Sequence, residues 1–298
     1  MVFKKIYDSL FKIYRLSDIS IYDIEKTKHL PIYGVYHIFM DTGWENVVKK
    51  QIKDLNASGL FNASEKIYIS CIAKDKNEIR KLTKIINNDK AEIIFYGNNP
   101  KEYEYPALKF IKKKSYEGDF LFYYFHTKGI TYQAFDCNDK MFINFKQKII
   151  SWCDMLTYFN FYKWRVAINV LSSDYETYGC YLWPPKMPCM YSGSFWWAKS
   201  QYIRKLPDFD DKKIKEDRFY SETWLFKKNA KHFSAFDTKA DLYFVDIPRS
   251  IYANVSPPLH DRITFSISYN WWKILKHFFH YNYKKRCQQR FQKLKNNI

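Results

Sequence analysis

The ten residues FLFYYFHTKG, Phe120–Gly129, join the most apolar run of the chain to a short polar turn. Six successive apolar or aromatic residues predict a buried strand, and the Thr, Lys and Gly that end the stretch predict a turn. In open parallel sheets, ligands bind beyond the carboxyl ends of the strands. The turn after Phe125 is therefore the first place where we expect a functional site.

Three more β-rich runs precede this one, at Ile32–Phe39, Ile67–Ala73 and Ile93–Tyr96, and segments of helical period separate them. Strand and helix alternating four times predict a parallel sheet covered by helices, an α/β fold with a Rossmann-like first half. Thr42 and Glu45 have the spacing of a capping box for the first of these helices. That helix is expected to end near Gly59.

The second half of the chain is less regular. Apolar residues spaced three and four apart from Phe142 to Phe159 predict an amphipathic core helix. Strands are expected at Ser194–Ala198 and Leu242–Val245, and a short helix near Ser221–Lys228. We divide the chain into an N-terminal extension (1–30), a Rossmann-like half (31–140), a less regular half (141–258) and a basic aromatic tail (259–298).

Composition limits the classes of partner. Lys and Arg number 49 against 31 Asp and Glu, a formal net charge of +18, so nucleic acid, anionic lipid and phosphorylated small molecules all qualify as ligands. The six cysteines form no C-x-x-C pair and predict thiols in a reducing compartment rather than a zinc site. Neither a G-x-G-x-x-G motif nor a P-loop occurs, which disfavours dinucleotide enzymes.

The turn His126-Thr127-Lys128-Gly129 is the sharpest local motif. Lys128 supplies a point charge, and Thr127 and the backbone N–H groups around Gly129 supply donors, so the turn is suited to a diphosphate. The alternative is an ordinary turn whose lysine points to solvent.

A second motif is Ser192-Gly193-Ser194-Phe195-Trp196-Trp197. Gly193 and Ser194 allow close approach of a ligand to the backbone, and a Trp ring offers a flat apolar face for a sugar. On a strand, Trp196 and Trp197 point to opposite faces, so at least one of them is expected in the core.

Two acidic motifs follow. Glu222 lies four residues after Arg218, so the two form either an exposed ion pair or a general base beside a cation. Asp208-Phe209-Asp210 is a literal D-x-D, the pattern with which many sugar transferases hold a metal. It lies in a loop with Asp211, Lys212, Lys213, Lys215 and Glu216, which indicates a solvated charge cluster instead.

Taken together, the motifs resemble a group of bacterial capsule and lipopolysaccharide glycosyltransferases. The resemblance runs from Ile32 to Trp224, and its motifs are Tyr36-His37-Ile38-Phe39 with Trp44, Ser58-Gly59-Leu60, Phe125-His126-Thr127-Lys128-Gly129, Ser192 to Ala198 with Tyr202 to Pro207, and Glu222-Thr223-Trp224. It implies a fold similar to the glycosyltransferase A type, in which a nucleotide-sugar-binding half is fused to an acceptor-binding half.

The resemblance also implies roles for single residues. Glu222 is the first choice for the base that activates the acceptor hydroxyl, and Asp217 is the second. The donor is expected to contact His37, Asp41, His126, Thr127, Lys128, Gly129 and Arg218, with Asp41 near the base or ribose, and the acceptor to contact Gly193, Ser194, Trp196 and Trp197. His126-Thr127-Lys128 stands where the family's metal-binding D-x-D is due. We therefore expect no metal ligands, although Mn²⁺ or Mg²⁺ is the alternative.

The tail from Trp271 to Ile298 has eight basic residues and no acidic one, interleaved with aromatics. It predicts a peripheral anchor on an anionic membrane, with a solvated basic helix as the alternative. No signal peptide or spanning helix is expected, which suggests the cytoplasmic face of the cell membrane.

The partners are then a UDP- or GDP-linked sugar and a lipid-linked or polysaccharide acceptor; no nucleic acid is expected. The rival classes are a basic nucleic-acid-binding protein and a non-catalytic scaffold of a polysaccharide assembly complex.

Overall fold

The structure is a computed structural model that describes residues 11–25, 29–133, 135–209 and 216–296. The chain forms two compact units. The sheet unit comprises Ser17–Ile130 and Leu156–Ala235, and the tail unit comprises Met1–Leu16, Thr131–Met155 and Phe236–Ile298. Each unit is described by itself below.

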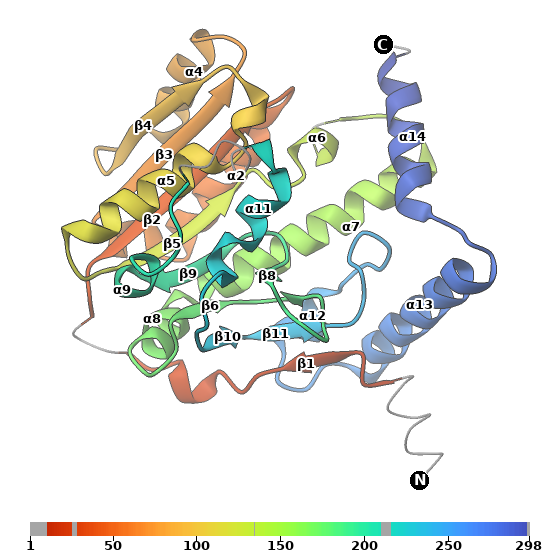
Figure 1. The fold of residues 1–298 in the computed structure, drawn as a ribbon. Helices are drawn as coiled ribbons and strands as arrows, with labels where there is room; N and C mark the ends of the chain where they lie inside the picture. The colour runs from red at the N-terminus through yellow and green to blue at the C-terminus, as the bar shows by residue number, and fades with distance from the viewer. Residues whose placement is uncertain (1–10, 26–28, 134, 210–215, 297–298) are drawn as a thin grey trace. The chain divides into compact units, whose positions relative to one another are not determined.

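The sheet unit is built on a mixed sheet of seven strands in the order β10-β6-β9-β5-β2-β3-β4 (Figure 1). Strands β5, β2, β3 and β4 are mutually parallel, β9 is antiparallel to both β5 and β6, and β10 is parallel to β6. A small antiparallel pair, β7 with β8, completes the unit. The bounds are β2 Ile32–Met40, β3 Lys66–Ala73, β4 Ala91–Gly97, β5 Leu121–His126, β6 Thr177–Gly179, β7 Leu182–Trp183, β8 Met190–Tyr191, β9 Trp196–Lys199 and β10 His232–Ser234.

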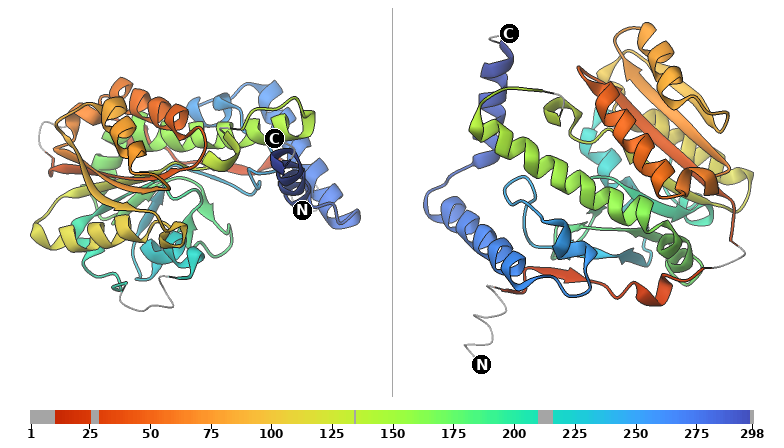
Figure 2. Two further views of the ribbon diagram at one scale, coloured as in Figure 1. Left: turned by 90° about the horizontal axis from the view of Figure 1, so that it is seen from above. Right: turned by 180° about the vertical axis from the view of Figure 1, so that it is seen from behind.

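Helices cover both faces of this sheet, with α2 and α4 on one face and α5 on the other (Figures 1 and 2). This arrangement follows from the strand order, because the connections through α2 and α4 step outward to β3 and β4, whereas α5 returns across the sheet to β5. The helices of the unit are α2 Trp44–Ala57, α3 Leu60–Ala63, α4 Asn77–Ile86, α5 Tyr105–Lys114, α8 Trp164–Leu171, α9 Ser200–Ile203 and α11 Arg218–Thr223, with short turns η1 Ser20–Tyr22, η2 Pro100–Glu102, η3 Ser115–Glu117, η4 Tyr158–Tyr162 and η5 Trp224–Phe226.

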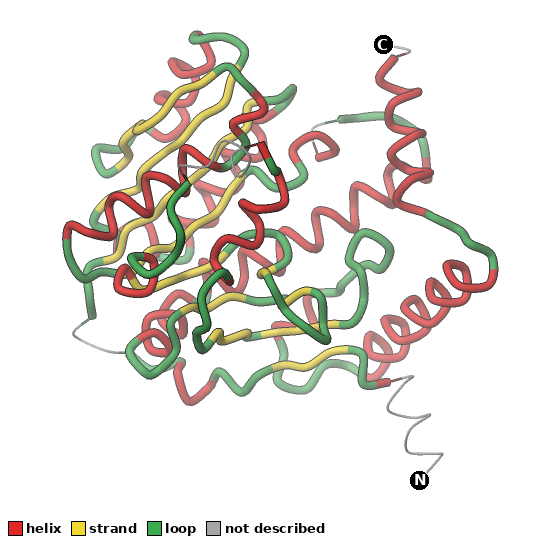
Figure 3. The backbone as a smooth tube through the Cα atoms, viewed as in Figure 1, coloured by secondary structure: helices red, strands yellow, loops and turns green. Residues whose placement is uncertain are grey.

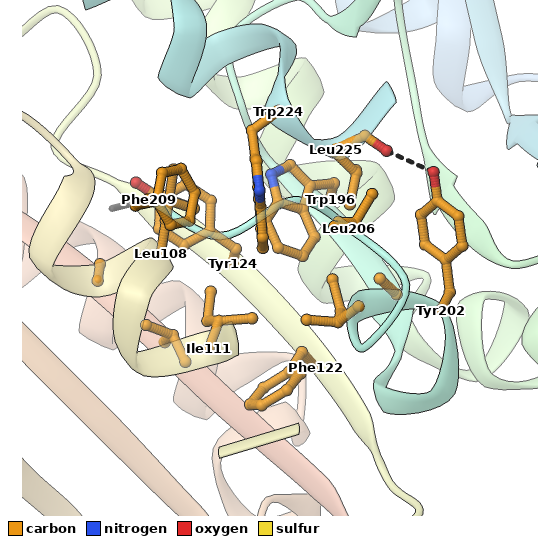
Figure 4. Close-up of a cluster of buried hydrophobic side chains, with 14 of the residues drawn as sticks. Leu108, Ile111, Phe122, Tyr124, Trp196, Tyr202, Leu206, Phe209, Trp224 and Leu225 are labelled. Atoms are coloured by element: carbon orange, nitrogen blue, oxygen red, sulfur yellow. Dashed lines mark hydrogen bonds between the residues drawn. The ribbon is translucent and has the colours of Figure 1, made fainter. Parts of the chain in front are cut away.

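Aromatic packing fills the face of the sheet under α5 (Figure 4). The Tyr124 ring on β5 lies 5.1 Å from the Trp196 ring on β9, and Trp224 lies 4.8 Å from Phe209. The Tyr202 hydroxyl donates to the Leu225 carbonyl at 2.7 Å, so the polar end of a buried ring is satisfied. This cluster connects α11 to the central strands, and α11 carries Glu222.

The tail unit contains the strand pair β1 (Tyr14–Leu16) and β11 (Phe236–Thr238), and α6 Ile130–Gln133 borders it. It also holds α12 Arg249–Ala253, α13 Leu259–Phe278 and α14 Tyr283–Asn296, and most of α7, Lys140–Thr157 (Figure 3). Its core packs Phe142, Phe145 and Ile149 of α7 against Cys287 and Phe291 of α14. Among the described residues, no helix is both long and apolar enough to cross a membrane.

The α/β class and the four parallel strands are confirmed, and every predicted strand in the first half lies within two residues of its observed bounds. The predicted helix from Phe142 is α7, whose predicted apolar positions are buried. None of the six cysteines, all of them in the described part, is disulfide-bonded.

Two local predictions are wrong. Thr42 and Glu45 form no capping box, because Gly43 takes the N-cap position in a left-handed conformation and the Asp41 carboxylate accepts the Thr42 N–H at 2.9 Å. The predicted strand Leu242–Val245 is a turn in which the Asp241 carboxylate accepts the Tyr243 N–H at 3.0 Å. In both places an aspartate side chain satisfies a nearby backbone donor, a local bond that competes with regular structure.

Candidate functional site

The candidate site lies at the carboxyl ends of β2 and β5, within the sheet unit. His37 on β2 and His126 on β5 are direct partners in the parallel ladder, and the Thr127 N–H donates to the His37 carbonyl at 3.1 Å. Two residues predicted to contact the donor are therefore neighbours. They are about ninety positions apart in the chain, so only the strand pairing brings them together.

Both histidines are neutral near pH 7. Burial lowers the pKa of the His37 imidazole to about 4, and the neighbouring His126 adds to the effect while Glu104 opposes it. Burial and the Lys128 ammonium lower the pKa of His126 to about 4 as well. The pair therefore contributes hydrogen-bonding groups to the site rather than positive charge.

The bonds of His126 assign its tautomer. Its Nε2 lies 2.9 Å from the Gly193 carbonyl oxygen, which can only accept, so Nε2 carries the hydrogen. In the neutral ring, Nδ1 then has a lone pair, and it lies 3.6 Å from Oε1 of Glu104. The contact with Glu104 is therefore not an ion pair while the ring is neutral.

Thr127 ties two strand ends together. Its hydroxyl accepts the Phe39 N–H at 2.9 Å and lies 3.4 Å from the Phe39 carbonyl, and the residue is buried. The predicted role of Thr127 as a diphosphate donor is not supported, because its hydroxyl and its N–H are already used within the fold. The bonds set the turn beside Met40 and Asp41, which follow Phe39.

The two glycine-containing motifs meet. Gly129 has φ +70° and Gly193 has φ +105°, backbone conformations that disfavour side chains. A Cβ on Gly193 would lie 2.6 Å from the Leu156 side chain and 3.2 Å from Cε of Lys128. The stem of Lys128 therefore runs along the backbone of Gly193, and the predicted donor and acceptor motifs share one site.

Two carboxylates border this site. Burial raises the pKa of Glu222 on α11, the charge of Glu104 raises it further, and Lys128 and Arg218 oppose the shift. Oε2 of Glu104 and the hydroxyl of Tyr124 are buried, and after burial itself the Glu104 carboxylate is the main cause that raises the pKa of Tyr124, through its charge and a side-chain hydrogen bond. Glu222 also acts on Tyr124, so the three side chains form a buried polar cluster at the carboxyl end of β5.

Glu104 and Tyr124 were absent from the sequence predictions. Glu104 takes the N-cap position of α5 without capping it, and Tyr124 lies inside the apolar run of β5. The one signal for Glu104 was a carboxylate in the loop between the third and fourth strands. Nothing in the sequence distinguished Tyr124 from its aromatic neighbours.

Arg218 and Asp217 differ in their relation to the site. Arg218 is exposed on α11, makes no salt bridge with Glu222, and acts electrostatically on both His126 and Glu222. Asp217 caps α11, since its carboxylate accepts the Phe219 N–H at 2.9 Å and its carbonyl accepts the Tyr105 hydroxyl. The Asp217 carboxylate is thus used within the fold, as the cap of α11.

The tryptophan pair belongs to the core. Trp196 and Trp197 are 5% and 0% exposed and point to opposite faces of the sheet, against Tyr124 and Tyr123 respectively. The Trp197 indole N–H donates to the Asn160 carbonyl at 3.0 Å. The opposite-face prediction is confirmed, but neither ring is exposed to stack on a sugar. Ser194 is buried as well, with its N–H bonded to the Tyr191 carbonyl.

A recess of about 270 Å³ lies beyond the carboxyl ends of β2 and β3. Asp41 lines it together with Trp44, the lysines Lys74 and Lys81, and the acidic residues Glu45, Asp75 and Glu78. The Trp44 indole N–H donates to Glu78 at 2.6 Å, which holds the ring in place. The Thr127 hydroxyl is hydrogen-bonded to Phe39, and Met40 and Asp41, which follow Phe39, line the recess. The recess is therefore next to the Lys128 turn.

The D-x-D motif lies away from these groups. Asp208 is 3.8 Å from the Lys112 ammonium, Phe209 is buried in the core of Figure 4, and Asp210 is outside the described residues. No group of three or more His, Cys, Asp or Glu side chains that could hold a metal occurs in the part of the chain that the structure describes.

The chain was compared with protein families, with curated proteins and with solved structures. No family model matches it, and neither does any curated protein or solved structure. A function must therefore be inferred from the chain's own side chains and their arrangement.

The lowered pKa of His37 predicts an acid-sensitive fold. A folded-state value of about 4 lies below the unfolded value of about 6.5, so the unfolded chain binds more protons between these values. The contribution of His37 to the free energy of unfolding is fully present above about pH 6.5. It falls by on the order of 3 kcal/mol as the pH drops to 4. The free energy of unfolding of His37→Gln, measured in urea between pH 7 and 4, should fall less steeply with decreasing pH than that of wild type. The matched control His29→Gln, at an exposed position, should keep the wild-type slope; equal slopes for all three proteins would contradict the prediction.

Proposed function

We propose that the chain is a glycosyltransferase of the A-type fold, which moves a sugar from a UDP- or GDP-linked donor to a saccharide acceptor during synthesis of a surface polysaccharide. The observation that carries the proposal is a buried cluster of carboxylates with cations beside it. Glu104 and Tyr124 form a buried polar pair, and Glu222, which interacts with both, has a raised pKa. Sugar hydroxyls donate hydrogen bonds to carboxylates, and diphosphates supply the anion that Lys128 and Arg218 attract.

The donor fits between two features of the carboxyl edge. The recess at Asp41 is of a size for part of a nucleoside, and the Lys128 turn is joined to it through Phe39. The diphosphate would then lie near the Lys128 ammonium, with the sugar directed toward Gly193 and Glu222. Ligands in open α/β sheets bind at this edge, which supports the same direction.

The chemistry is a displacement at the anomeric carbon. Glu222 accepts the proton of an acceptor hydroxyl, the acceptor oxygen forms a bond to the anomeric carbon, and the bond from that carbon to the donor phosphate breaks. The nucleoside diphosphate leaves with the bonding electron pair, stabilised by Lys128 and Arg218. Burial makes the Glu222 carboxylate more basic than an exposed one, as its role requires.

A donor screen tests the function directly. Purified protein is incubated with UDP-, GDP-, CMP- and dTDP-sugars, with Mn²⁺ or with EDTA, and both thermal shift and nucleotide release are measured. We expect a shift and slow hydrolysis with UDP- or GDP-sugars, retained in EDTA. Salt-sensitive binding of random-sequence RNA without any nucleotide response would favour a nucleic-acid-binding protein instead.

The variant Glu222→Gln tests whether Glu222 acts as the general base without contributing to donor affinity. We expect the donor affinity to stay within about twofold of wild type and kcat to fall by roughly 10²- to 10⁴-fold, the usual contribution of a general base. The control Glu65→Gln removes an exposed carboxylate elsewhere in the sheet unit and should leave both values unchanged. Near-normal turnover of Glu222→Gln, with activity lost in Glu104→Gln, would transfer the role to Glu104.

Lys128→Ala tests the diphosphate contact. Removing a charged donor from an anion costs roughly 1.5–3 kcal/mol, so affinity for UDP or GDP should fall about 10- to 100-fold by calorimetry. Lys113→Ala, an exposed lysine on α5, is the matched control and should bind as wild type does. A Lys128→Ala protein with full affinity and full turnover would exclude this residue from the donor site.

A further inference from the structure

Helix α13 of the tail unit has apolar residues on two faces. On one face, Phe265 and Tyr269 are buried, 1% and 7% exposed. On the other, six large apolar residues are exposed, and we call them the α13 stripe: Leu259 67%, Ile263 40%, Ile267 64%, Trp271 58%, Ile274 40% and Phe278 78%. Contiguous exposed apolar surface on a folded chain marks an interaction site more often than scattered single residues do.

The spacing places the stripe on one side of the helix. Successive members are four, four, four, three and four residues apart, and at about 100° per residue all six fall within an arc of about 120°. The buried Phe265 and Tyr269 lie on the opposite arc. The helix is therefore already docked through one face, and the six apolar residues of the other face remain 40–78% exposed.

Charge identifies the class of partner that fits this face. From Trp271 onward the chain has eight Lys and Arg residues and no Asp or Glu. A second copy would bring the same positive charge to the stripe, which opposes pairing, whereas an anionic surface is complementary.

We propose that the α13 stripe binds an anionic lipid bilayer, with the helix axis in the plane of the membrane. Its apolar side chains enter the boundary between headgroups and acyl chains, Trp271 lies at the interface, and the exposed lysines of α14 bind the lipid phosphates. The tail was predicted to anchor the chain from Trp271 on; the stripe extends that contact back to Leu259. The inference does not depend on the proposed transferase activity.

Vesicle flotation of the full chain tests the apolar contact. Wild type should float with phosphatidylcholine vesicles that contain phosphatidylglycerol, and much less with phosphatidylcholine alone. Ile267→Ser should weaken binding about tenfold, from the loss of one buried apolar side chain. Ile21→Ser is the matched control, because Ile21 is 65% exposed in the sheet unit against 64% for Ile267, and it should float as wild type does.

A charge variant and an association measurement complete the test. The double variant Lys285→Gln and Lys293→Gln, at exposed positions of α14, should lose roughly thirtyfold of its affinity for the anionic vesicles. Equal melting temperatures by circular dichroism establish that the variants are folded. The proposal is overturned if Ile267→Ser and Ile21→Ser float equally, or if light scattering finds a wild-type dimer that Ile267→Ser converts to a monomer.

Discussion

The position of β5 between two unlike neighbours is the constraint on which the sheet unit depends. β5 pairs parallel with β2 on one side and antiparallel with β9 on the other. Because β9 runs in the opposite direction, its beginning lies beside the end of β5. The turn that leaves β5 and the loop that enters β9 consequently meet at one edge, where the Gly193 carbonyl accepts the His126 Nε2 hydrogen. A parallel β9 would have carried Gly193 to the far edge of the sheet.

The first four strands of the sheet unit could be predicted because the residues of each strand are by themselves enough to indicate it. Each is a continuous β-rich run, which can be recognised without knowledge of its neighbours. β2, β3 and β5 are buried on both faces, whereas β4 is an edge strand with no fully buried residue. The same reasoning located the Lys128 turn, since the turn directly follows such a run. The capping box failed for the opposite reason, because Thr42 and Glu45 match the motif while the Asp41 side chain competes for the backbone donor.

The candidate site was predicted only where a motif follows a strand. Glu104 and Tyr124 were missed because only the packing of α5 against β5 brings their side chains together, which spacing does not encode. Thr127 and the Trp196–Trp197 pair were assigned to ligands, although strand pairing and aromatic packing use them fully. Polar and aromatic residues near a site often hold it together, and sequence alone does not separate the two uses.

The α13 stripe has a consequence for the protein in free solution. The net charge of +18 keeps copies apart only over the distance that salt allows, and the Debye length shrinks from about 30 Å at 0.01 M to about 8 Å at 0.15 M. As screening increases, the repulsion weakens while six exposed apolar side chains keep their cost in water. Added salt therefore favours association of this chain. A protein whose copies attract one another through charge responds in the opposite way, since salt separates its copies.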